Sequence, residues 1–202
     1  MVPPANILIL FFHPLYHKSR VHRQLVEAVR QMDGITFRNM YDLYPDFHID
    51  IRREQELLVN HDLIIWQHPL YWYSSPSLLK EWIDLVLEHG FAFGTKGRAL
   101  EGKQVMTVVS TGGREEAYRT EGANRYSMRQ LLAPFEQTVT LCRMQYLPPF
   151  VVHGTHLLEE SAIRREAERY RQVLTGLRDG FFDPEELLSL NYINDLNTTQ
   201  TP

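Results

Sequence analysis

The sequence predicts a doubly wound α/β sandwich, in which a five-stranded parallel sheet carries helices on both faces. Three observations predict this class. Short apolar runs such as "NILILFF" (residues 6–12) are typical of strands that are buried on both sides. Segments with apolar residues at helical spacing follow these runs along the chain. The 202 residues are enough for a sizeable core, and 23% of them are charged, which is ordinary for a globular protein.

The first half of the chain predicts three strands. Residues 6–12 form the first strand, and the next helix carries Val21, Leu25 and Val29 on one face, with Ser19 as its N-cap. Residues 35–40 predict a more exposed second strand, residues 51–60 a short helix and residues 62–67 the third strand. The helix that follows is expected to be capped by Ser75, with Pro76 in its first turn.

The second half predicts two further strands and a C-terminal extension. Residues 103–110 predict the fourth strand, residues 126–138 a helix, and residues 139–147 ("VTLCRMQYL") the fifth strand. A charged amphipathic helix then carries Ile163, Ala167, Tyr170, Val173, Leu174 and Leu177. We expect one domain over residues 1–180 and a partly disordered extension over residues 181–202. That extension holds a short helix in "FFDPEELLSL" and a polar tail, "NDLNTTQTP".

Composition excludes several classes of function. The net charge of −4 gives no basic surface, so nucleic acid is not an expected partner. No apolar run has the length of a membrane span, and the first residues lack the pattern of a secretory signal, so we expect a cytoplasmic protein. The single cysteine, Cys142, fits a reducing compartment and is interpreted as a small buried hydrophobe.

Three loops are candidates for a ligand site, because ligands of open α/β sheets bind beyond the carboxyl ends of the strands. The first loop, "HPLYHKSRVH", ends at a helix N-terminus, where backbone amides and Ser19 could hold a phosphate. Lys18, Arg20 and His22 add positive character. Neither a P-loop nor a GxGxxG motif is present in it. The alternative is a serine-capped helix with solvated basic residues.

The second loop, "HPLYWYSSP", holds three consecutive aromatic residues, Tyr71, Trp72 and Tyr73. Flat rings at a binding edge suit a flat ligand, although one or two of them could instead be core or dimer contacts. The third loop carries Gly112 and Gly113, which permit close approach of a ligand to the backbone or simply form a tight turn. Together the three loops favour a mononucleotide with a large planar head group, and flavin mononucleotide (FMN) fits better than a purine nucleotide.

These same stretches resemble a known family. "HPLYHKSRVHRQL", "YDLYPDFHIDIRREQELL", "LIIWQHPLYWYSSPSLLKEWIDLVLEHGFAFG", "TGGREEAYRTEGANRY" and "CRMQYLPPF" are similar to segments of the flavodoxin-like NAD(P)H:quinone reductases. Within that family they look most like the ancillary proteins of glutathione-gated potassium efflux systems. The resemblance implies a homodimer with a flavin site at each subunit interface, and we expect FMN rather than FAD.

The resemblance also implies residue roles. The phosphate side of the flavin would meet His13, Ser19, Arg20, Val21 and His22. The ring would lie along Leu70, Tyr71, Trp72 and Tyr73, and the closing loop would be Thr111, Gly112, Gly113 and Arg114. Tyr118 matches the catalytic tyrosine of the family, and Asn124 takes the place of its catalytic histidine. Hydride would pass from NAD(P)H to the flavin, and two electrons would pass on to a quinone.

Two other functions are open at this point. The first is a regulatory subunit that activates a potassium efflux antiporter and lies at the inner face of the cell membrane through that partner. The second is a metal hydrolase built on His13, His17, His22 and His68, but no HExxH spacing accompanies them. A serine hydrolase is disfavoured because no GxSxG elbow is present.

Overall fold

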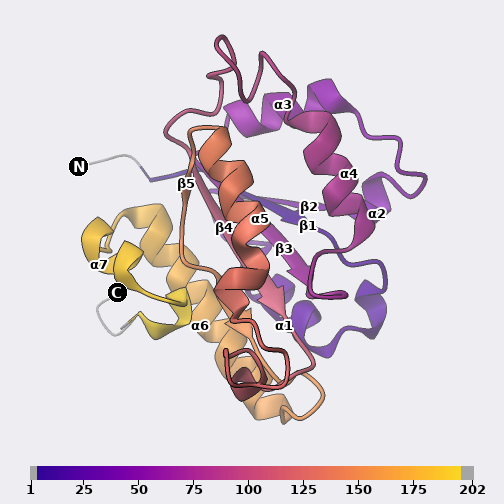
Figure 1. Ribbon diagram of the computed structural model, residues 1–202, viewed down its shortest axis with the longest axis vertical. Helices are drawn as coiled ribbons and strands as arrows, with labels where there is room; N and C mark the ends of the chain where they lie inside the picture. Colours follow the sequence, from indigo (N-terminus) through magenta and orange to yellow (C-terminus); the bar gives the residue numbers. More distant parts are fainter. Residues whose placement is uncertain (1–3, 197–202) are drawn as a thin grey trace.

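A parallel sheet with five strand positions forms the centre of the protein, as the computed structural model shows for the residues it describes, 4–196 (Figure 1). The strands are β1 (Ile7–Phe11), β2 (Ile35–Asn39), β3 (Leu63–Pro69), β4 (Gln104–Ser110), β5 (Gln145–Tyr146) and β6 (Phe150–Val152). Their order is β2-β1-β3-β4-β5, with β6 also paired to β4, and every pairing is parallel. The predicted doubly wound class is therefore confirmed.

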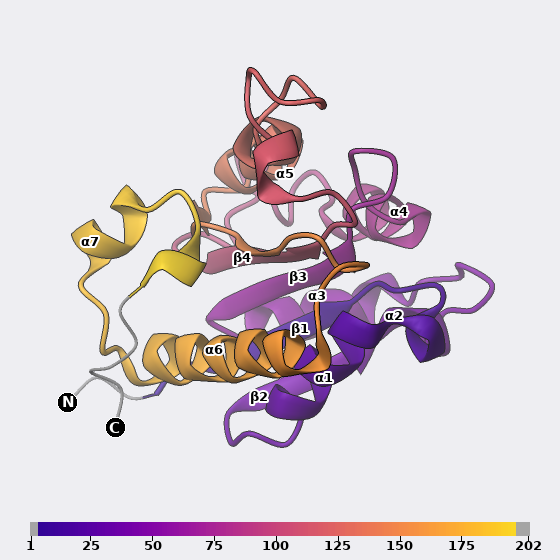
Figure 2. The same cartoon turned by 90° about the horizontal axis from the view of Figure 1, so that it is seen from below.

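Helices cover both faces of this sheet. They are α1 (Arg20–Val29), α2 (Met40–Leu43), α3 (Ile51–Val59), α4 (Ser77–Val86), α5 (Met128–Leu141), α6 (Glu160–Asp179) and α7 (Pro184–Ser189), with 3₁₀ turns η1 (Tyr16–Lys18), η2 (Glu115–Ala117) and η3 (Ile193–Asp195). Figure 2 shows α1 and α6 on one side of the sheet and α4 and α5 on the other, and α3 packs into the same core as α4 and α5. The sheet is thus a middle layer, which explains why its central strands are apolar on both faces.

Each face of the sheet has its own core, and β1 contributes to both. Leu8, Leu10 and Phe12 pack into the core under α3, α4 and α5, whereas Ile7 and Ile9 pack into the core under α1 and α6. This alternation follows from the two-residue period of a strand. The edge strand β2 is only partly buried along its length, as the more polar sequence "ITFRN" predicts.

The prediction for the fifth strand was wrong in its position. Residues 139–141 continue α5, and the edge position is filled by two short pieces, β5 and β6, which pair with opposite ends of β4. Val139 extends the buried stripe of α5, and a short apolar run does not by itself distinguish a helix from a strand. Pro148 and Pro149 then interrupt the edge, because proline has no N–H to donate to a ladder.

The predicted cap of the fourth helix was also wrong. Pro76 is the N-cap of α4, and no side chain caps the helix there. Pro76 has an extended backbone, with ψ at 147°, so the helix begins one residue later than expected, at Ser77. Ser19, by contrast, caps α1 as predicted, because its side chain accepts a hydrogen bond from the His22 N–H.

The chain beyond α6 packs back onto the core in the part that is described. Leu187, Ile193 and Leu196 are buried against the α6 face of the sheet. The Ile193 N–H donates to the Pro149 carbonyl at 3.1 Å, which holds η3 against the segment between β5 and β6. The first three residues of the polar tail, 194–196, therefore belong to the folded structure, and residues 197–202 lie outside the described residues. Among residues 4–196, no helix combines the length and the apolar character needed to cross a bilayer.

Candidate functional site

The carboxyl ends of β1, β3 and β4 surround a cavity of 320 Å³. The sheet order changes direction between β1 and β3, and cavities at such a switch point are where doubly wound proteins bind ligands. A volume of this size is at the lower end of the range for small-molecule sites. The cavity is lined by His13, Leu15, Lys18, Ser19, Arg20, Val21, Pro69, Leu70, Tyr71, Ser110, Gly112, Thr155 and His156.

One end of the cavity is formed by the N-terminus of α1. Ser19 satisfies the backbone N–H of His22, and the N–H groups of Arg20 and Val21 in the same first turn have no partner within the helix. The positive end of the helix dipole therefore faces the cavity. The Arg20 guanidinium donates to the Leu158 carbonyl at 3.0 Å and lies 3.7 Å from Glu160, which holds its charge at the rim. This end suits an anionic group such as a phosphate.

The aromatic turn, residues 71–74, borders the cavity through Tyr71. Tyr71 and Ser74 exchange two backbone hydrogen bonds, of 3.0 and 2.9 Å, so residues 72 and 73 form the tip of a tight turn. Trp72 and Tyr73 have φ angles of 50° and 61°, a left-handed conformation that bulky residues rarely adopt. Trp72 is 94% exposed. Strained, exposed aromatic residues are typical of a functional loop rather than of a core.

The third wall is the glycine loop that follows β4. A Cβ atom on Gly112 would lie 2.9 Å from the His156 ring, and one on Gly113 would lie 3.0 Å from the Tyr118 ring. The Gly113 carbonyl accepts from the Gly154 N–H at 2.8 Å, which fastens this loop to the segment after β6. The tight packing explains both glycines. It also places Tyr118 directly behind the loop.

Tyr118 is buried, and its hydroxyl is hydrogen-bonded to Thr111 Oγ1. Its ring lies 5.4 Å from that of His153, which in turn lies 5.8 Å from Tyr192. The Asn124 side-chain oxygen accepts from the Tyr73 hydroxyl at 3.5 Å, so Asn124 lies next to the aromatic turn. The two predicted catalytic residues therefore flank the glycine loop and the aromatic turn rather than the cavity itself.

The structure brings together about half of the predicted binding residues on the cavity wall. These are His13, Ser19, Arg20, Val21, Leu70, Tyr71 and Gly112. The others lie in the same loops but not on the wall, namely His22, Trp72, Tyr73, Thr111, Gly113 and Arg114. His22 is fully buried beneath the cavity. Sequence reasoning missed Ser110, Thr155 and His156, and only Ser110, a hydroxyl residue directly before "TGG", carried a signal that could have identified it.

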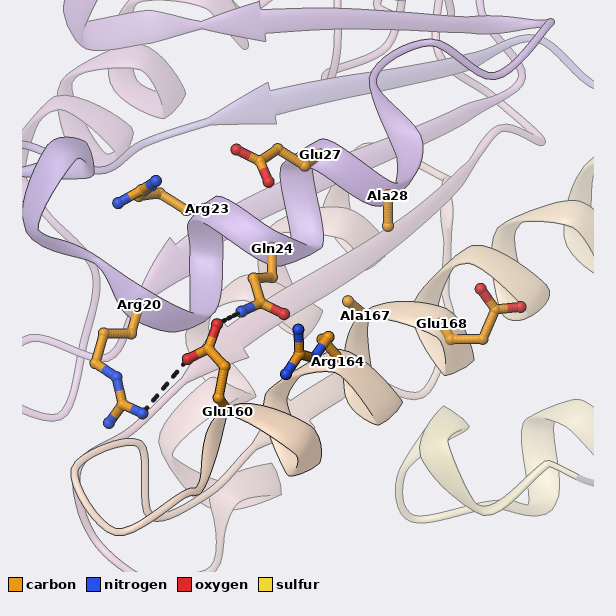
Figure 3. A pocket seen from close by; sticks show the side chains of 9 residues that line it. All are labelled: Arg20, Arg23, Gln24, Glu27, Ala28, Glu160, Arg164, Ala167 and Glu168. Carbon is orange, nitrogen blue, oxygen red and sulfur yellow. Dashed lines mark hydrogen bonds and ion pairs between the residues drawn. The ribbon is translucent and has the colours of Figure 1, made fainter.

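A second cavity, of 700 Å³, lies between α1 and α6 and is not a good candidate (Figure 3). It is away from the strand ends, and charged side chains of both signs line it. Glu160 pairs with Arg20 and accepts from Gln24, so its charge is already compensated within the protein. In Figure 3 these three side chains converge, whereas Glu27 points away from them. This cavity is best described as a solvent-filled groove between the polar surfaces of α1 and α6.

The histidines of the site are not arranged for a metal. Within residues 4–196, no group of three or more histidine, cysteine, aspartate or glutamate side chains could hold a metal ion. The His13 ring nitrogen Nδ1 accepts from the Leu15 N–H at 3.1 Å, and burial lowers the pKa of His13 to about 4. Burial also lowers the pKa of His68 to about 4. These rings are therefore neutral near pH 7.

Acid is expected to destabilise the fold through these histidines. A histidine has a pKa near 6.5 in the unfolded chain, so between pH 6.5 and about 4 the unfolded state binds more protons than the folded state. The free energy of unfolding should therefore fall as the pH is lowered through this range, by up to about 3 kcal/mol for His68 alone. Urea unfolding at several pH values measures this slope. His68→Phe should reduce it, whereas His17→Phe, at an exposed position, should leave it unchanged.

The fold and the cavity together define a class: a doubly wound α/β protein with a cavity at the carboxyl edge of its sheet that suits a planar, anionic ligand. The sequence model of the family described as "Flavodoxin-like fold" matches residues 5–174. The chain belongs to this family, as the resemblance predicted.

Individual relatives agree with this assignment. The chain is 46% identical to general stress protein 14 of Bacillus subtilis over 84% of its own length and 97% of that protein. It is 43% identical to the glutathione-regulated potassium-efflux system ancillary protein KefG of Pectobacterium atrosepticum, covering 87% of this chain and 96% of that one. Among solved structures, general stress protein 14 of Treponema denticola in complex with FMN matches with a TM-score of 0.82 and 40% identity, over 85% of this chain and 99% of that one.

Proposed function

We propose that this protein is an FMN-binding oxidoreductase that reduces quinones with NAD(P)H. The observation that carries the proposal is the cavity at the switch point, bounded by a helix N-terminus, an aromatic turn and a glycine loop. The FMN complex of the 40%-identical relative supports the cofactor. A solved protein from P. pentosaceus described as an NADPH-quinone reductase, 35% identical with a TM-score of 0.77 over 84% of this chain and 98% of that one, supports the reaction.

The residues of the cavity fit FMN. Ser19, Arg20 and Val21 at the start of α1 would hold the phosphate, and the backbone of Gly112 lies on the cavity wall, where the ring would meet it. Leu70 and Tyr71 offer apolar surface to the planar group. The chemistry that bound FMN supplies is two-electron transfer from NAD(P)H to a quinone. Apart from this phosphate site at the start of α1, the sequence holds no motif for binding a second nucleotide. This favours FMN over FAD.

The protein's own share in this chemistry is orientation and hydrogen bonding. Tyr118 and Thr111 form a hydrogen-bonded pair behind the glycine loop, and a hydroxyl donor there can stabilise negative charge that develops on a reduced ring. Asn124 can donate a hydrogen bond but cannot take up a proton near neutrality. Tyr118 is therefore the principal candidate for a catalytic side chain, and Asn124 a secondary one.

Tyr118→Phe is expected to slow reduction of the flavin by NADPH about tenfold, because the proposed hydrogen-bond donor behind the glycine loop is lost. The variant also deprives buried Thr111 of a hydrogen bond, so the free energy of unfolding should fall by about 1–3 kcal/mol. Stopped-flow absorbance at the flavin band measures the rate. If Tyr118 were only a packing residue, the variant would show the same loss of stability with an unchanged rate.

The purified protein tests the function directly. It should be yellow, and heat denaturation should release a compound that co-migrates with FMN in chromatography. Addition of NADH or NADPH should bleach the flavin, and a soluble benzoquinone should restore the colour and support turnover. Release of FAD, or a colourless protein that does not take up added FMN, would reject the proposal.

We further propose that the protein is a homodimer. Leu15, Trp72 and Tyr73 are 46%, 94% and 53% exposed near the cavity, and so much apolar surface is unusual on a monomer. A second copy would cover this surface and complete the wall of each site. Light scattering of the flavin-loaded protein should give twice the mass of one chain. A monomer mass with flavin bound would contradict the dimer.

A regulatory role is a second proposal, and the 43% identity to KefG over 87% of the chain favours it. The dimer would bind a potassium efflux antiporter at the inner face of the membrane and raise its activity. Potassium efflux triggered by a glutathione adduct should be faster in cells that carry the gene than in cells that lack it. Equal potassium efflux in the two kinds of cell would reject the regulatory role and leave the reductase activity as the proposed function. Activation that survives in a folded, dimeric variant with Trp72 and Tyr118 replaced would show that regulation does not need turnover.

A further inference from the structure

A chain of buried polar side chains lies beneath the cavity and ends at its wall. The Tyr170 hydroxyl donates to Gln67 Oε1 at 3.2 Å, Gln67 Nε2 lies 3.3 Å from His22 Nδ1, and His22 Nε2 lies 2.9 Å from Ser110 Oγ. Tyr170, Gln67 and His22 are fully buried, and Ser110 is 7% exposed. The chain joins α6, β3, α1 and β4, so each link is fixed by a different element.

The direction of every hydrogen bond in this chain follows from the first one. Because Gln67 Oε1 accepts from Tyr170, the amide nitrogen of Gln67 faces His22. An amide NH₂ group can only donate, so His22 Nδ1 must be the acceptor and must carry no hydrogen. A charged imidazolium would carry a hydrogen on Nδ1 as well, so the Nδ1–H of His22 would face the Nε2–H of Gln67 with no acceptor between them. Burial lowers the pKa of His22 well below its usual value, in agreement with a neutral ring.

The neutral ring then carries its hydrogen on Nε2 and donates it to Ser110 Oγ. The serine hydroxyl is left with its own hydrogen to donate. Among residues 4–196, the Ser110 side chain has no second hydrogen-bond partner. Ser110 forms part of the cavity wall, next to Leu70, whose N–H donates to the Ser110 carbonyl at 2.8 Å. Ser110 is therefore the member of the chain that reaches the cavity wall, and its hydroxyl hydrogen is available to a group in the cavity.

We propose that His22 is a positioning residue, which holds the Ser110 hydroxyl as an obligatory hydrogen-bond donor to an acceptor oxygen of the bound flavin. This inference rests on the proposed flavin function and goes beyond it. It assigns a role to Ser110, and it gives His22 an indirect role in place of the direct flavin contact that the resemblance implied. A donor fixed in this way favours ligands that present an oxygen acceptor at this point of the cavity.

A double-mutant cycle on flavin affinity tests the proposal. Apoprotein is titrated with FMN, and quenching of flavin fluorescence gives the dissociation constant. Ser110→Ala removes the donor and should weaken binding about five- to tenfold. His22→Asn removes the Nε2 donor and should weaken binding by the same factor. The double variant should be no weaker than either single one, because His22 acts only through Ser110.

Two further variants separate positioning from general packing. His22→Gln can place an amide nitrogen where the imidazole Nε2 lies, and it should bind FMN within about twofold of the wild type. His17→Asn, at an exposed histidine outside the cavity wall, should match the wild type. Effects of His22→Asn and Ser110→Ala that multiply in the double variant would overturn the proposal, because His22 would then act independently of Ser110.

Nuclear magnetic resonance of the wild type tests the hydrogen-bond direction even if His22→Asn does not fold. Protein labelled with ¹⁵N-histidine should show His22 as the neutral form with hydrogen on Nε2, with and without FMN. The Nδ1–H form or an imidazolium at pH 7 would overturn the proposal. A wild type that binds no flavin would reject the proposed function itself, whereas normal flavin binding with multiplying effects would reject only the role of His22.

A titration of the same variants with riboflavin, which lacks the phosphate, identifies the acceptor. A Ser110→Ala effect that persists with riboflavin supports an acceptor on the ring or ribityl chain. An effect seen only with FMN supports a phosphate oxygen. Equal affinity of the wild type and Ser110→Ala for both ligands would overturn the proposal.

Discussion

Replacing Glu54 with alanine is expected to lower the free energy of unfolding by about 3–5 kcal/mol, the largest loss of stability that we expect from a single change. The Glu54 side chain is fully buried. It accepts from Arg38 at 2.6 Å and from the Tyr44 hydroxyl at 2.8 Å through one oxygen, and from Trp82 Nε1 at 3.0 Å through the other. Alanine would leave the Arg38 charge without a carboxylate partner, with only its 3.4 Å hydrogen bond to the Tyr44 hydroxyl. The Tyr44 hydroxyl and Trp82 Nε1 would each lose the acceptor they have in Glu54.

The Glu54 carboxylate connects four elements around one point. Glu54 belongs to α3, Arg38 to β2 and Trp82 to α4, and Tyr44 follows α2 directly. Burial and the neighbouring Glu54 raise the pKa of Tyr44 to about 12, so its hydroxyl remains a donor at ordinary pH. Since α4 begins shortly after the aromatic turn, loss of this network should also loosen one wall of the cavity.

Glu56 on the same helix provides the matched control. Its side chain is 65% exposed and lies 3.5 Å from Arg53, so Glu56→Ala should change stability by less than about 0.5 kcal/mol. Glu54→Gln keeps the shape of the side chain but can accept through one oxygen only. Its loss of free energy of unfolding should lie between the losses of Glu54→Ala and Glu56→Ala. Urea unfolding followed by circular dichroism measures all three. A loss below about 1 kcal/mol for Glu54→Ala would show that the hydrogen bonds of the buried Glu54 carboxylate contribute little to the stability of the fold.

Most of the fold could be predicted because its signals are local. A strand that is buried on both faces must be apolar at nearly every residue, as β1 and the first four residues of β3 are. Helices at the surface must repeat apolar residues near every third or fourth position, as α6 does. The edge of the sheet could not be predicted in the same way. β5 and β6 are short and are defined by their pairing with β4, which depends on contacts distant in sequence.

The site could be predicted in part for the same reason. Once a doubly wound sheet is inferred, the loops after the first, third and fourth strands must meet at one edge. Thr155 and His156 reach the cavity only because β6 pairs beside β4, so nothing local identified them. His22 was predicted at the surface of the site as a basic residue. Its true position depends on Gln67 and Ser110, which are far away in the sequence.

The aromatic turn shows a conflict between local structure and function. Tyr71 and Ser74 close a two-residue turn in which both central residues have positive φ, a turn type that strongly favours Asn-Gly. The chain has Trp72 and Tyr73 at these positions instead. A left-handed conformation costs roughly 1–2 kcal/mol for each residue other than glycine. Because Trp72 is 94% exposed, packing within the subunit does not repay this strain.

Replacing Trp72 and Tyr73 together with Asn and Gly should therefore stabilise the apoprotein by about 1–3 kcal/mol and raise its melting temperature by roughly 2–10 °C. The same change should weaken FMN binding about tenfold to hundredfold. Trp72 and Tyr73 lie outside the cavity wall of the single chain, but the family resemblance places both rings along the flavin, and this contact would be lost. Differential scanning fluorimetry and flavin titration measure the two effects. Trp72→Phe, which keeps both the ring and the strain, should change neither by much. A double variant that melts at the wild-type temperature or below would contradict this interpretation. Trp72 and Tyr73 would then already stabilise the turn, for example through contacts in the dimer, and would not be retained for the ligand at a cost in stability.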